Sequence, residues 1–250
     1  MTLSQFFQDH PKIALAFSGG ADSAYLLWAA LDAGAEVGAY FVSTPFQPAF
    51  EKADARRLAE ELGVLLRVVP VDVLAAEHVA DNPPRRCYYC KKSLFTALKT
   101  RAAADGYDTV IDGTNASDDA GDRPGMAALR EMGVLSPLRL CGVTKEDVRR
   151  ASRAAGLFTW EKPSYACLAT RFPTGRTITP SELQKVEAGE AALMARGYRN
   201  LRLRLREDGV LLQLPESQLP RARGEWKELE TLLAPWFARA ALDDTPRKEE

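Results

Sequence analysis

The sequence has few cysteines, no strong charge of either sign and no long apolar run. Four cysteines in 250 residues are too few for a disulfide scaffold, and in a reducing cytosol they would be thiols. Lys and Arg total 33 against 34 for Asp and Glu, which disfavours a strongly basic nucleic-acid binder. The longest apolar run, residues 24–31, is far shorter than the ~20 residues of a membrane span. The N-terminus lacks the pattern of a signal peptide, so we expect a cytoplasmic protein that binds neither membranes nor nucleic acid.

Strand and helix signals alternate over about the first 155 residues. Apolar runs typical of buried parallel strands are followed by amphipathic or glycine-terminated helices. Repeated βα units imply an α/β fold with a parallel sheet and right-handed crossovers. The expected strands cover residues 13–17, 36–43, 64–73, 109–113 and 134–139, and the expected helices cover residues 22–33, 48–62, 91–104 and 145–155.

The pattern changes after Gly156. A stretch with prolines and no clear period predicts a linker or an active-site loop. Beyond it we expect a helix over residues 180–196, a hairpin of strands 200–206 and 210–214, a final helix over residues 218–237 and a polar tail at residues 243–250. The sequence therefore predicts an α/β domain at residues 1–155, a loop or linker at residues 156–179 and a small α+β domain at residues 180–250.

The loop after the first strand combines glycines with hydroxyl groups. Gly19 and Gly20 allow a tight turn and a close approach to a ligand, and Ser18 and Ser23 add hydroxyl donors. The start of the next helix offers N–H groups that suit a phosphate. An ordinary βα turn capped by Asp22 or Ser23 would contain the same residues. The full string SGGADS is more specific, because it resembles the SGGxDS signature of the PP-loop ATP pyrophosphatases.

That resemblance implies the adenine-nucleotide alpha hydrolase-like fold and contacts to ATP. The loop would grip the pyrophosphate of ATP, and Asp22 would lie beside Mg²⁺ and the pyrophosphate. The family's second strand contacts adenine through its backbone, which points to Phe41. The implied chemistry is adenylation of a carbonyl or carboxylate, after which nitrogen or sulfur displaces AMP.

Cys87 and Cys90 form a CxxC motif that we expect in a loop ahead of a helix. A zinc site would need about four ligands, and His78 is the other nearby candidate. The motif could instead be a redox dithiol, two structural thiols, or part of a cluster site with a third cysteine. Cys167 lies in another loop and is the obvious third thiol, whereas Cys141 is expected to be a small buried residue.

Five short motifs lie between the first strand and the C-terminal hairpin. They are KPSYACLATR at residues 162–171, DGTNASD at 112–118, DRPG at 122–125, SPL at 136–138 and TK at 144–145. Together they resemble the motifs of the LarE family, the ATP-dependent sulfur transferases of nickel-pincer cofactor biosynthesis. The resemblance runs from the first strand to the C-terminal hairpin, and Thr170 stands where the family usually has serine.

The resemblance implies adenylation of a pyridinium mononucleotide that carries two carboxylates, followed by attack of a protein-held sulfur to give a thiocarboxylate. Some members have one cysteine, matching Cys167, and sacrifice its sulfur. Others also carry the CxxC motif and hold a [4Fe-4S] cluster on three cysteines. With Cys87, Cys90 and Cys167 this chain is similar to the cluster type. The implied cofactors are ATP, Mg²⁺ and the cluster. The implied partners are the small-molecule nucleotide, further copies in a homo-oligomer and a downstream nickel-insertion protein.

Arginines and a glutamate are the candidates for the substrate site. Arg202 and Arg204 alternate with leucines, which is also the pattern of a solvated face on an edge hairpin. Guanidinium groups suit phosphates and carboxylates, and the resemblance implies that both line the substrate site together with Arg171. Glu190 matches an acidic residue of the family near that site, with a catalytic role alongside Cys167 and Asp22. An ordinary surface glutamate would fit the sequence equally well.

Three other functions remain open. A tRNA thiolation enzyme would also use a PP-loop and cysteines, although it would need a large basic surface. An amide-forming synthetase would leave the cysteines without a role. A nucleotide sensor would bind ATP without releasing pyrophosphate.

Overall fold

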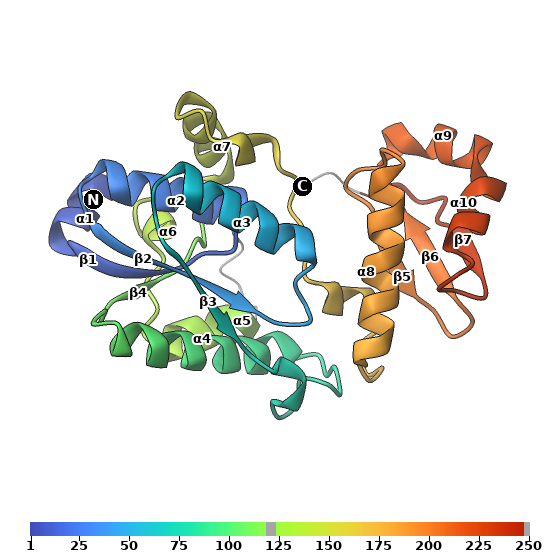
Figure 1. The fold of residues 1–250 in the computed structure, drawn as a ribbon, viewed down its shortest axis with the longest axis horizontal. Coiled ribbons are helices and arrows are strands. Elements are labelled where there is room, and N and C mark those ends of the chain that lie inside the picture. The colour runs from blue at the N-terminus through green and yellow to red at the C-terminus, as the bar shows by residue number, and fades with distance from the viewer. Residues whose placement is uncertain (119–123, 248–250) are drawn as a thin grey trace. The chain divides into compact units, whose positions relative to one another are not determined.

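A computed structural model describes residues 1–118 and 124–247, and the chain divides into two units (Figure 1). Unit 1 comprises Met1–Val79 and Arg85–Lys162, and unit 2 comprises Ala80–Pro84 and Pro163–Glu250. Each unit has a sheet of its own. Within the described ranges, none of the helices combines the length and apolar character needed to span a bilayer.

The sheet of unit 1 is entirely parallel, in the order β3-β2-β1-β4. β1 lies inside it, with Leu15 opposite Ala39 of β2 on one side and Ile111 of β4 on the other. Parallel neighbours need long crossovers, and helices provide them here. The predicted α/β fold with a parallel sheet is therefore confirmed. The strands are β1 Lys12–Ala16, β2 Glu36–Ser43, β3 Leu66–Pro70 and β4 Val110–Ile111.

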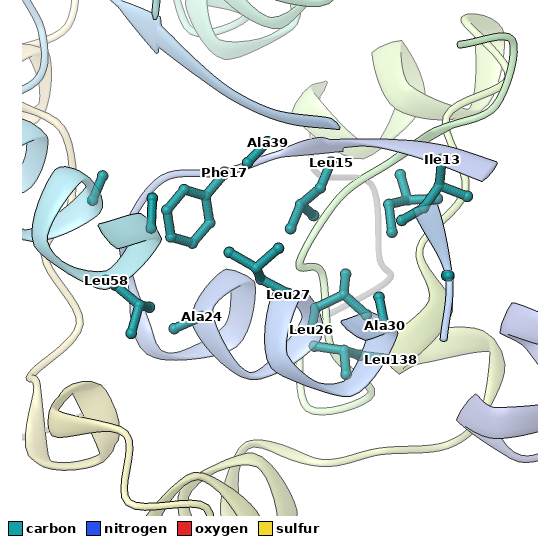
Figure 2. Packing of buried hydrophobic residues seen from close by; sticks show 14 of the residues in the cluster. Ile13, Leu15, Phe17, Ala24, Leu26, Leu27, Ala30, Ala39, Leu58 and Leu138 are labelled. Atoms are coloured by element: carbon teal, nitrogen blue, oxygen red, sulfur yellow. The ribbon is translucent and has the colours of Figure 1, made fainter. Parts of the chain in front are cut away.

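The side chains of β1 alternate between two hydrophobic clusters. Ile13 and Leu15 are fully buried on the face that also holds Leu27 (Figure 2). Ala14 belongs to the second cluster, together with Leu98. Burying an aliphatic side chain of this size stabilises the fold by about 1.5–3 kcal/mol. The central strand is thus fixed from both faces, and so is the start of the loop that follows it.

The helices of unit 1 supply both clusters. α2 begins directly after the loop that follows β1, which places its N-terminus at the carboxyl end of the central strand. The helices are α1 Leu3–Asp9, α2 Ala21–Asp32, α3 Ala49–Glu61, α4 Arg86–Ala104, α5 Pro124–Glu131, α6 Pro137–Leu140 and α7 Lys145–Ala154, with 3₁₀ turns η1 Val73–Ala75 and η2 Phe158–Glu161.

Two predictions for unit 1 are wrong. Residues 134–139 do not form a fifth strand, because only Leu135 makes a bridge to Ile111 and α6 begins at Pro137. Proline has a fixed φ and no N–H, so it suits the first turn of a helix and cannot continue a strand ladder as a donor. The CxxC motif lies inside α4 rather than in a loop, because that helix begins at Arg86.

Unit 2 has a three-stranded sheet in the order β5-β6-β7, in which β5 and β6 form an antiparallel hairpin and β7 runs parallel to β6. Helix α8 contacts β5, and α10 contacts α8 and β7. The elements are η3 Leu168–Arg171, α8 Pro180–Ala195, β5 Arg202–Leu205, β6 Val210–Gln213, η4 Glu216–Gln218, α9 Leu219–Gly224, α10 Trp226–Leu233 and β7 Ala240–Leu242.

One prediction for unit 2 is also wrong. Residues 218–237 form two helices, because α9 ends at Gly224 and α10 begins at Trp226. Glycine costs roughly 1 kcal/mol in a helix interior, which favours a break there. At Arg247, the last described residue of the predicted polar tail, the backbone N–H donates to the Leu214 carbonyl at 2.8 Å.

Candidate functional site

The loop that follows β1 is folded around two hydroxyl groups. The Oγ atoms of Ser18 and Ser23 lie 3.1 Å apart, and Ser23 Oγ donates to the Gly20 carbonyl at 3.2 Å. Gly19 has a φ of +72°, in the left-handed region that favours glycine. Gly20 is the N-cap of α2, so the first N–H groups of that helix lack intrahelical partners. The loop therefore has the tight turn and the helix N-terminus that suit a phosphate.

Asp22, in the first turn of α2, has partners from two other segments. Its Oδ2 lies 2.5 Å from Lys145 Nζ, and its Oδ1 accepts a hydrogen bond from Asn115 Nδ2 at 3.1 Å. Lys145 is the first residue of α7, and Asn115 follows β4. The resemblance to PP-loop proteins predicts that the Asp22 carboxylate lies beside Mg²⁺. In the structure, hydrogen bonds to both of its oxygens orient this carboxylate.

The loop after β4 packs directly on the start of α2. A Cβ on Gly113 would lie 2.9 Å from the backbone nitrogen of Ser23, so a larger residue would displace the helix. Asp112 is buried, and it accepts hydrogen bonds of 2.6 Å from the hydroxyls of Thr114 and Ser136. The DGTN motif is therefore held against the phosphate loop by its own side chains.

A pocket of about 320 Å³ lies between these two loops and α4. It lies at the carboxyl end of the parallel strands, which is where open α/β sheets bind ligands. Phe41 of β2 lines the pocket and is only 2% exposed. Leu94, Phe95 and Leu98 of α4 give the pocket an apolar wall. Polar loops on one side and an apolar wall on the other suit a nucleotide with its phosphates and base.

The CxxC motif lies at the start of α4. Cys87 is exposed, and Arg86 Nη2 donates to its sulfur at 3.6 Å. Lys91 follows Cys90 directly and lines the 320 Å³ pocket. The two cysteines therefore lie on the same helix as the apolar wall of the candidate nucleotide pocket.

Two tyrosines between the cysteines hold the first turn of α4 in place. The Tyr88 hydroxyl donates to Glu131 of α5 at 2.6 Å. The ring of Tyr89 lies 4.8 Å from that of His78, the residue that the sequence offers as a zinc ligand. These tertiary contacts explain why the helix begins at Arg86, five residues before the predicted start.

The structure shows two thiols together, but no complete metal site. Within each unit, the described residues include no group of three or more His, Cys, Asp or Glu side chains arranged around a metal. Cys87 and Cys90 belong to unit 1, and Cys167 belongs to unit 2. Burial raises the pKa of the Cys141 thiol, which packs at the edge of the core.

Cys167 is the N-cap of η3 and lies in a turn wrapped by Arg171. The Cys167 carbonyl accepts hydrogen bonds from Thr170 Oγ1 at 2.9 Å and from Arg171 Nη1 at 3.2 Å. Arg171 Nη1 also donates to the Ala166 carbonyl at 2.6 Å. The Thr170 hydroxyl thus makes a contact that a serine could make equally well. The buried Arg171 side chain determines the shape of the turn that presents Cys167.

Arg171 forms a buried ion pair with Glu190 of α8. Two parallel hydrogen bonds of 2.8 Å join the side chains, which are 0% and 1% exposed. Glu190 also accepts from the Leu203 N–H at 2.8 Å and from the Tyr165 hydroxyl at 2.5 Å. Glu190 is therefore not a surface residue. Burial lowers the pKa of the Arg171 guanidinium, but the hydrogen bonds and charge of Glu190 outweigh it and the pKa is raised.

The arginine face of β5 is not solvated. Arg202 is 3% exposed and donates to the Ser164 carbonyl at 2.9 Å. Arg204 is half-buried, donates to the Thr170 carbonyl and contacts Gln213 Oε1 at 3.0 Å. Both arginines thus hold the segment that carries Cys167.

Among the residues that the structure describes, three arginines of unit 2 surround one carboxylate. Arg171, Arg202 and Arg204 all interact with the carboxylate of Glu190. Burial, together with repulsion from Arg171 and Arg247, lowers the pKa of Arg202 to about 10 and also lowers that of Arg204. A pocket of about 350 Å³, lined by Arg171 and Arg204, adjoins them. An anion in this pocket would lie beside the positive charges of Arg171 and Arg204.

Sequence reasoning missed Lys145, Asn115 and Tyr165, which orient Asp22 and Glu190. All three lie within matching motifs, which was the available signal, but nothing in the sequence shows which carboxylate each one contacts. The Asp122–Arg123 part of the DRPG motif lies outside the described residues.

A parallel α/β sheet with a glycine- and serine-rich phosphate loop and a pocket at its carboxyl end defines the class of PP-loop, adenine-nucleotide alpha hydrolase-like proteins. The tRNA-specific 2-thiouridylase MnmA of Frankia alni is 28% identical over 187 residues, 61% of this chain and 53% of that protein. The pyridinium-3,5-bisthiocarboxylic acid mononucleotide synthase of Lactiplantibacillus plantarum is 34% identical over 220 residues, 87% of this chain and 80% of that enzyme. The chain belongs to the family of this synthase, the LarE family. An uncharacterized protein of Synechocystis sp. is 36% identical over 218 residues, 87% of this chain and 81% of that protein. No protein-family model matches the chain.

Proposed function

We propose that this chain is an ATP-dependent sulfur transferase that converts carboxylates of pyridinium-3,5-biscarboxylic acid mononucleotide to thiocarboxylates. The observation that carries the proposal is the phosphate loop and its pocket in a chain whose relative in Lactiplantibacillus plantarum is named as the corresponding synthase. A substrate carboxylate oxygen attacks the α-phosphorus of ATP, which releases pyrophosphate and forms an acyl-adenylate. A sulfur nucleophile then attacks the carbonyl carbon, and AMP leaves.

The phosphate loop would serve the first step. Ser18, Gly19, Gly20 and Ser23 would bind the leaving pyrophosphate, and Asp22 would hold the accompanying Mg²⁺. The Oδ1 atom of Asp22 accepts a hydrogen bond from Asn115, so the chain itself orients the carboxylate that would hold the metal. The backbone of Phe41, at the apolar end of the pocket, would contact the adenine.

The arginines of unit 2 would bind the anionic groups of the mononucleotide. Arg202 is buried and Arg204 is half-buried, and planar guanidinium groups pair well with phosphates and carboxylates. Arg171 and Glu190 engage each other through two hydrogen bonds. Their proposed contribution to substrate binding and catalysis is therefore to hold the Cys167 turn in place.

Cys87, Cys90 and Cys167 would hold a [4Fe-4S] cluster. The first two are three residues apart on a helix, so their side chains share a face, and thiolates are the usual ligands of such clusters. These three thiolates would hold the cluster through three of its irons, and the group would supply the fourth iron as the carrier of a transferable sulfide. Sacrifice of the Cys167 sulfur is the alternative source.

Iron content tests the cluster. Anaerobic reconstitution should give about four irons per chain, and Cys→Ser at position 87, 90 or 167 should lose most of them. Cys141→Ser is the matched control and should keep its iron. Full iron content in the Cys167→Ser variant would contradict the three-cysteine site.

Product analysis tests the function itself. ATP, Mg²⁺ and the biscarboxylate mononucleotide should together yield AMP, pyrophosphate and a thiocarboxylate. Formation of ADP would contradict the PP-loop chemistry. Thiolation of tRNA in place of the mononucleotide would favour the activity named for the MnmA relatives.

The proposal includes three features of the cellular setting. The protein would work in the cytoplasm, where its cysteines remain thiols. It would assemble as a homo-oligomer. Its thiocarboxylate product would pass to a nickel-insertion protein.

A further inference from the structure

Lys162 lies at the end of unit 1 and contacts the phosphate loop. Its Nζ lies 2.6 Å from Asp54 Oδ2 of α3 and donates to the Gly19 carbonyl at 3.1 Å. The lysine side chain is 16% exposed, and its ammonium lies 5.7 Å from the centre of the Phe50 ring. Lys162 is the first residue of the KPSYACLATR motif, five positions before Cys167, yet its contacts are with the ATP side of the protein.

The contact to Gly19 determines where the next N–H points. The peptide bond between Gly19 and Gly20 is trans, so its carbonyl and its N–H point in opposite directions. With the carbonyl directed at Lys162, the Gly20 N–H turns to the other side, where it lies 3.4 Å from Ser18 Oγ. Ser18 and Gly20 both line the 320 Å³ pocket. The Gly20 N–H therefore points to the pocket side of the loop, where a phosphate would bind.

This peptide needs external support, because glycine restricts its own backbone least of all residues. A flipped peptide would present a carbonyl oxygen to the phosphate in place of an N–H. Gly19 already packs closely on α3, since a Cβ there would lie 2.9 Å from the Ala55 nitrogen. Asp54, the residue before Ala55, forms an ion pair with the Lys162 ammonium. One turn of α3 thus supports the loop both by packing and through the lysine.

We propose that Lys162 is a positioning residue that keeps the Gly19–Gly20 peptide in the orientation that binds pyrophosphate. The proposal rests on the proposed function, because it requires the loop to bind the β and γ phosphates of ATP. Lys162, the first residue of the KPSYACLATR motif that carries Cys167, would then support the adenylation step. AMP lacks those phosphates, so its binding should not depend on Lys162.

The test compares the affinities of pyrophosphate and AMP by titration calorimetry. Lys162→Met should weaken pyrophosphate binding about 10- to 100-fold, the equivalent of one charge-assisted hydrogen bond, and should leave AMP affinity unchanged. Lys162→Arg keeps a donor and a charge near the carbonyl and should restore most of the pyrophosphate affinity. Asp54→Asn should weaken pyrophosphate binding in the same direction. Lys185→Met, at an exposed position on α8, is the control and should match the unmodified protein.

The outcomes separate this proposal from the function it rests on. If the unmodified protein binds pyrophosphate and Lys162→Met binds it equally well, the positioning role is wrong and the function stands. An equal loss of pyrophosphate and AMP affinity would also overturn the role, since it would indicate a general loosening of the pocket. If neither the unmodified protein nor the Lys185→Met control binds pyrophosphate, the ATP-splitting function fails and the role fails with it.

Discussion

At the level of single residues, the carboxylate of Glu190 determines how the Cys167 turn is held. It accepts hydrogen bonds from Arg171, Tyr165 and the Leu203 N–H, all inside unit 2. Glu190→Gln keeps the shape but leaves the Arg171 charge buried without its partner. Breaking a buried ion pair in this way typically costs about 3–5 kcal/mol. Urea unfolding should therefore show a lower free energy of unfolding by about that amount.

A surface variant provides the reference for that measurement. Glu230→Gln, at an exposed position on α10, should change the free energy of unfolding by less than about 0.5 kcal/mol. Equal stability of the two variants would show that the Arg171–Glu190 pair contributes nothing to the fold of unit 2.

The buried charge of Arg202 leads to a second prediction about a single residue. Arg202→Ala should weaken binding of the mononucleotide by about 1.5–3 kcal/mol, the usual value for a hydrogen bond to a charged group, without changing AMP affinity. Arg239→Ala, whose side chain is 76% exposed, is the matched control. Calorimetric titration with each ligand measures both effects. Unchanged mononucleotide affinity in Arg202→Ala would place the substrate elsewhere.

The pH dependence of mononucleotide binding follows from the same arginine. Burial and neighbouring cations lower the Arg202 pKa from 12.5 to about 10, so the unliganded protein releases this proton more easily than the unfolded chain does. The anionic ligand binds the charged form. Its affinity should therefore be constant below the pKa and should fall as the pH rises through about 10. A flat profile across that range, measured in the unmodified protein, would show that the ligand does not contact this charge.

At the scale of elements, the close packing of the phosphate loop on α3 can be tested with one methyl group. Gly19 and Gly34 both have left-handed φ values, +72° and +79°. A Cβ at Gly19 would lie 2.9 Å from Ala55, whereas a Cβ at Gly34 would meet nothing within 4 Å. Each Gly→Ala change strains the backbone by about 1–2 kcal/mol, and overpacking at Gly19 should add about 1–3 kcal/mol.

Thermal or urea unfolding of both variants isolates that packing term. Gly19→Ala should be the less stable of the two and should also lose ATP affinity, because the loop must move away from α3. Equal stability together with normal ATP binding would mean that the loop does not pack on α3 as the structure shows.

The elements that were predictable from sequence are those set by local pattern. β1 and β2 are continuous apolar runs, and α7 follows a threonine cap, so local chemistry was enough to place them. The start of α4 was not predictable, because its first turn is held by Glu131 and His78, which lie far from it in the sequence. Pro137 argues against a strand over residues 134–139, and the preference of proline for the first turn of a helix explains why α6 begins there.

In the candidate site, too, features set by local sequence could be predicted, whereas contacts between distant residues could not. The SGGADS loop was readable because its glycines and hydroxyls act within seven residues of one another. The Asp22–Lys145 contact joins residues 123 positions apart, and the Arg171–Glu190 pair depends on how η3 meets α8. Alternation in β5 indicated a polar face, but only tertiary packing shows that Arg202 is buried in it.

For the whole molecule, the proposed function needs both units. The phosphate loop, its pocket and the CxxC motif belong to unit 1, whereas Cys167 and the arginines proposed to bind the substrate belong to unit 2. Adenylation and sulfur delivery should therefore be separable by variants in different units. Asp22→Ala should abolish AMP formation, and Cys87→Ser should permit AMP formation but not thiocarboxylate formation. Chromatographic assay of both products in each variant tests this division.

Anaerobic turnover followed by mass measurement of the intact chain tests whether the cluster, and not Cys167 itself, supplies the sulfur. The reconstituted protein, ATP, Mg²⁺ and the biscarboxylate mononucleotide are mixed, and AMP, thiocarboxylate and the chain are quantified from the same sample. We expect thiocarboxylate to form together with AMP, and the chain to keep its mass with Cys167 intact. A chain lighter by one hydrogen sulfide at Cys167, in proportion to the thiocarboxylate formed, would contradict this expectation.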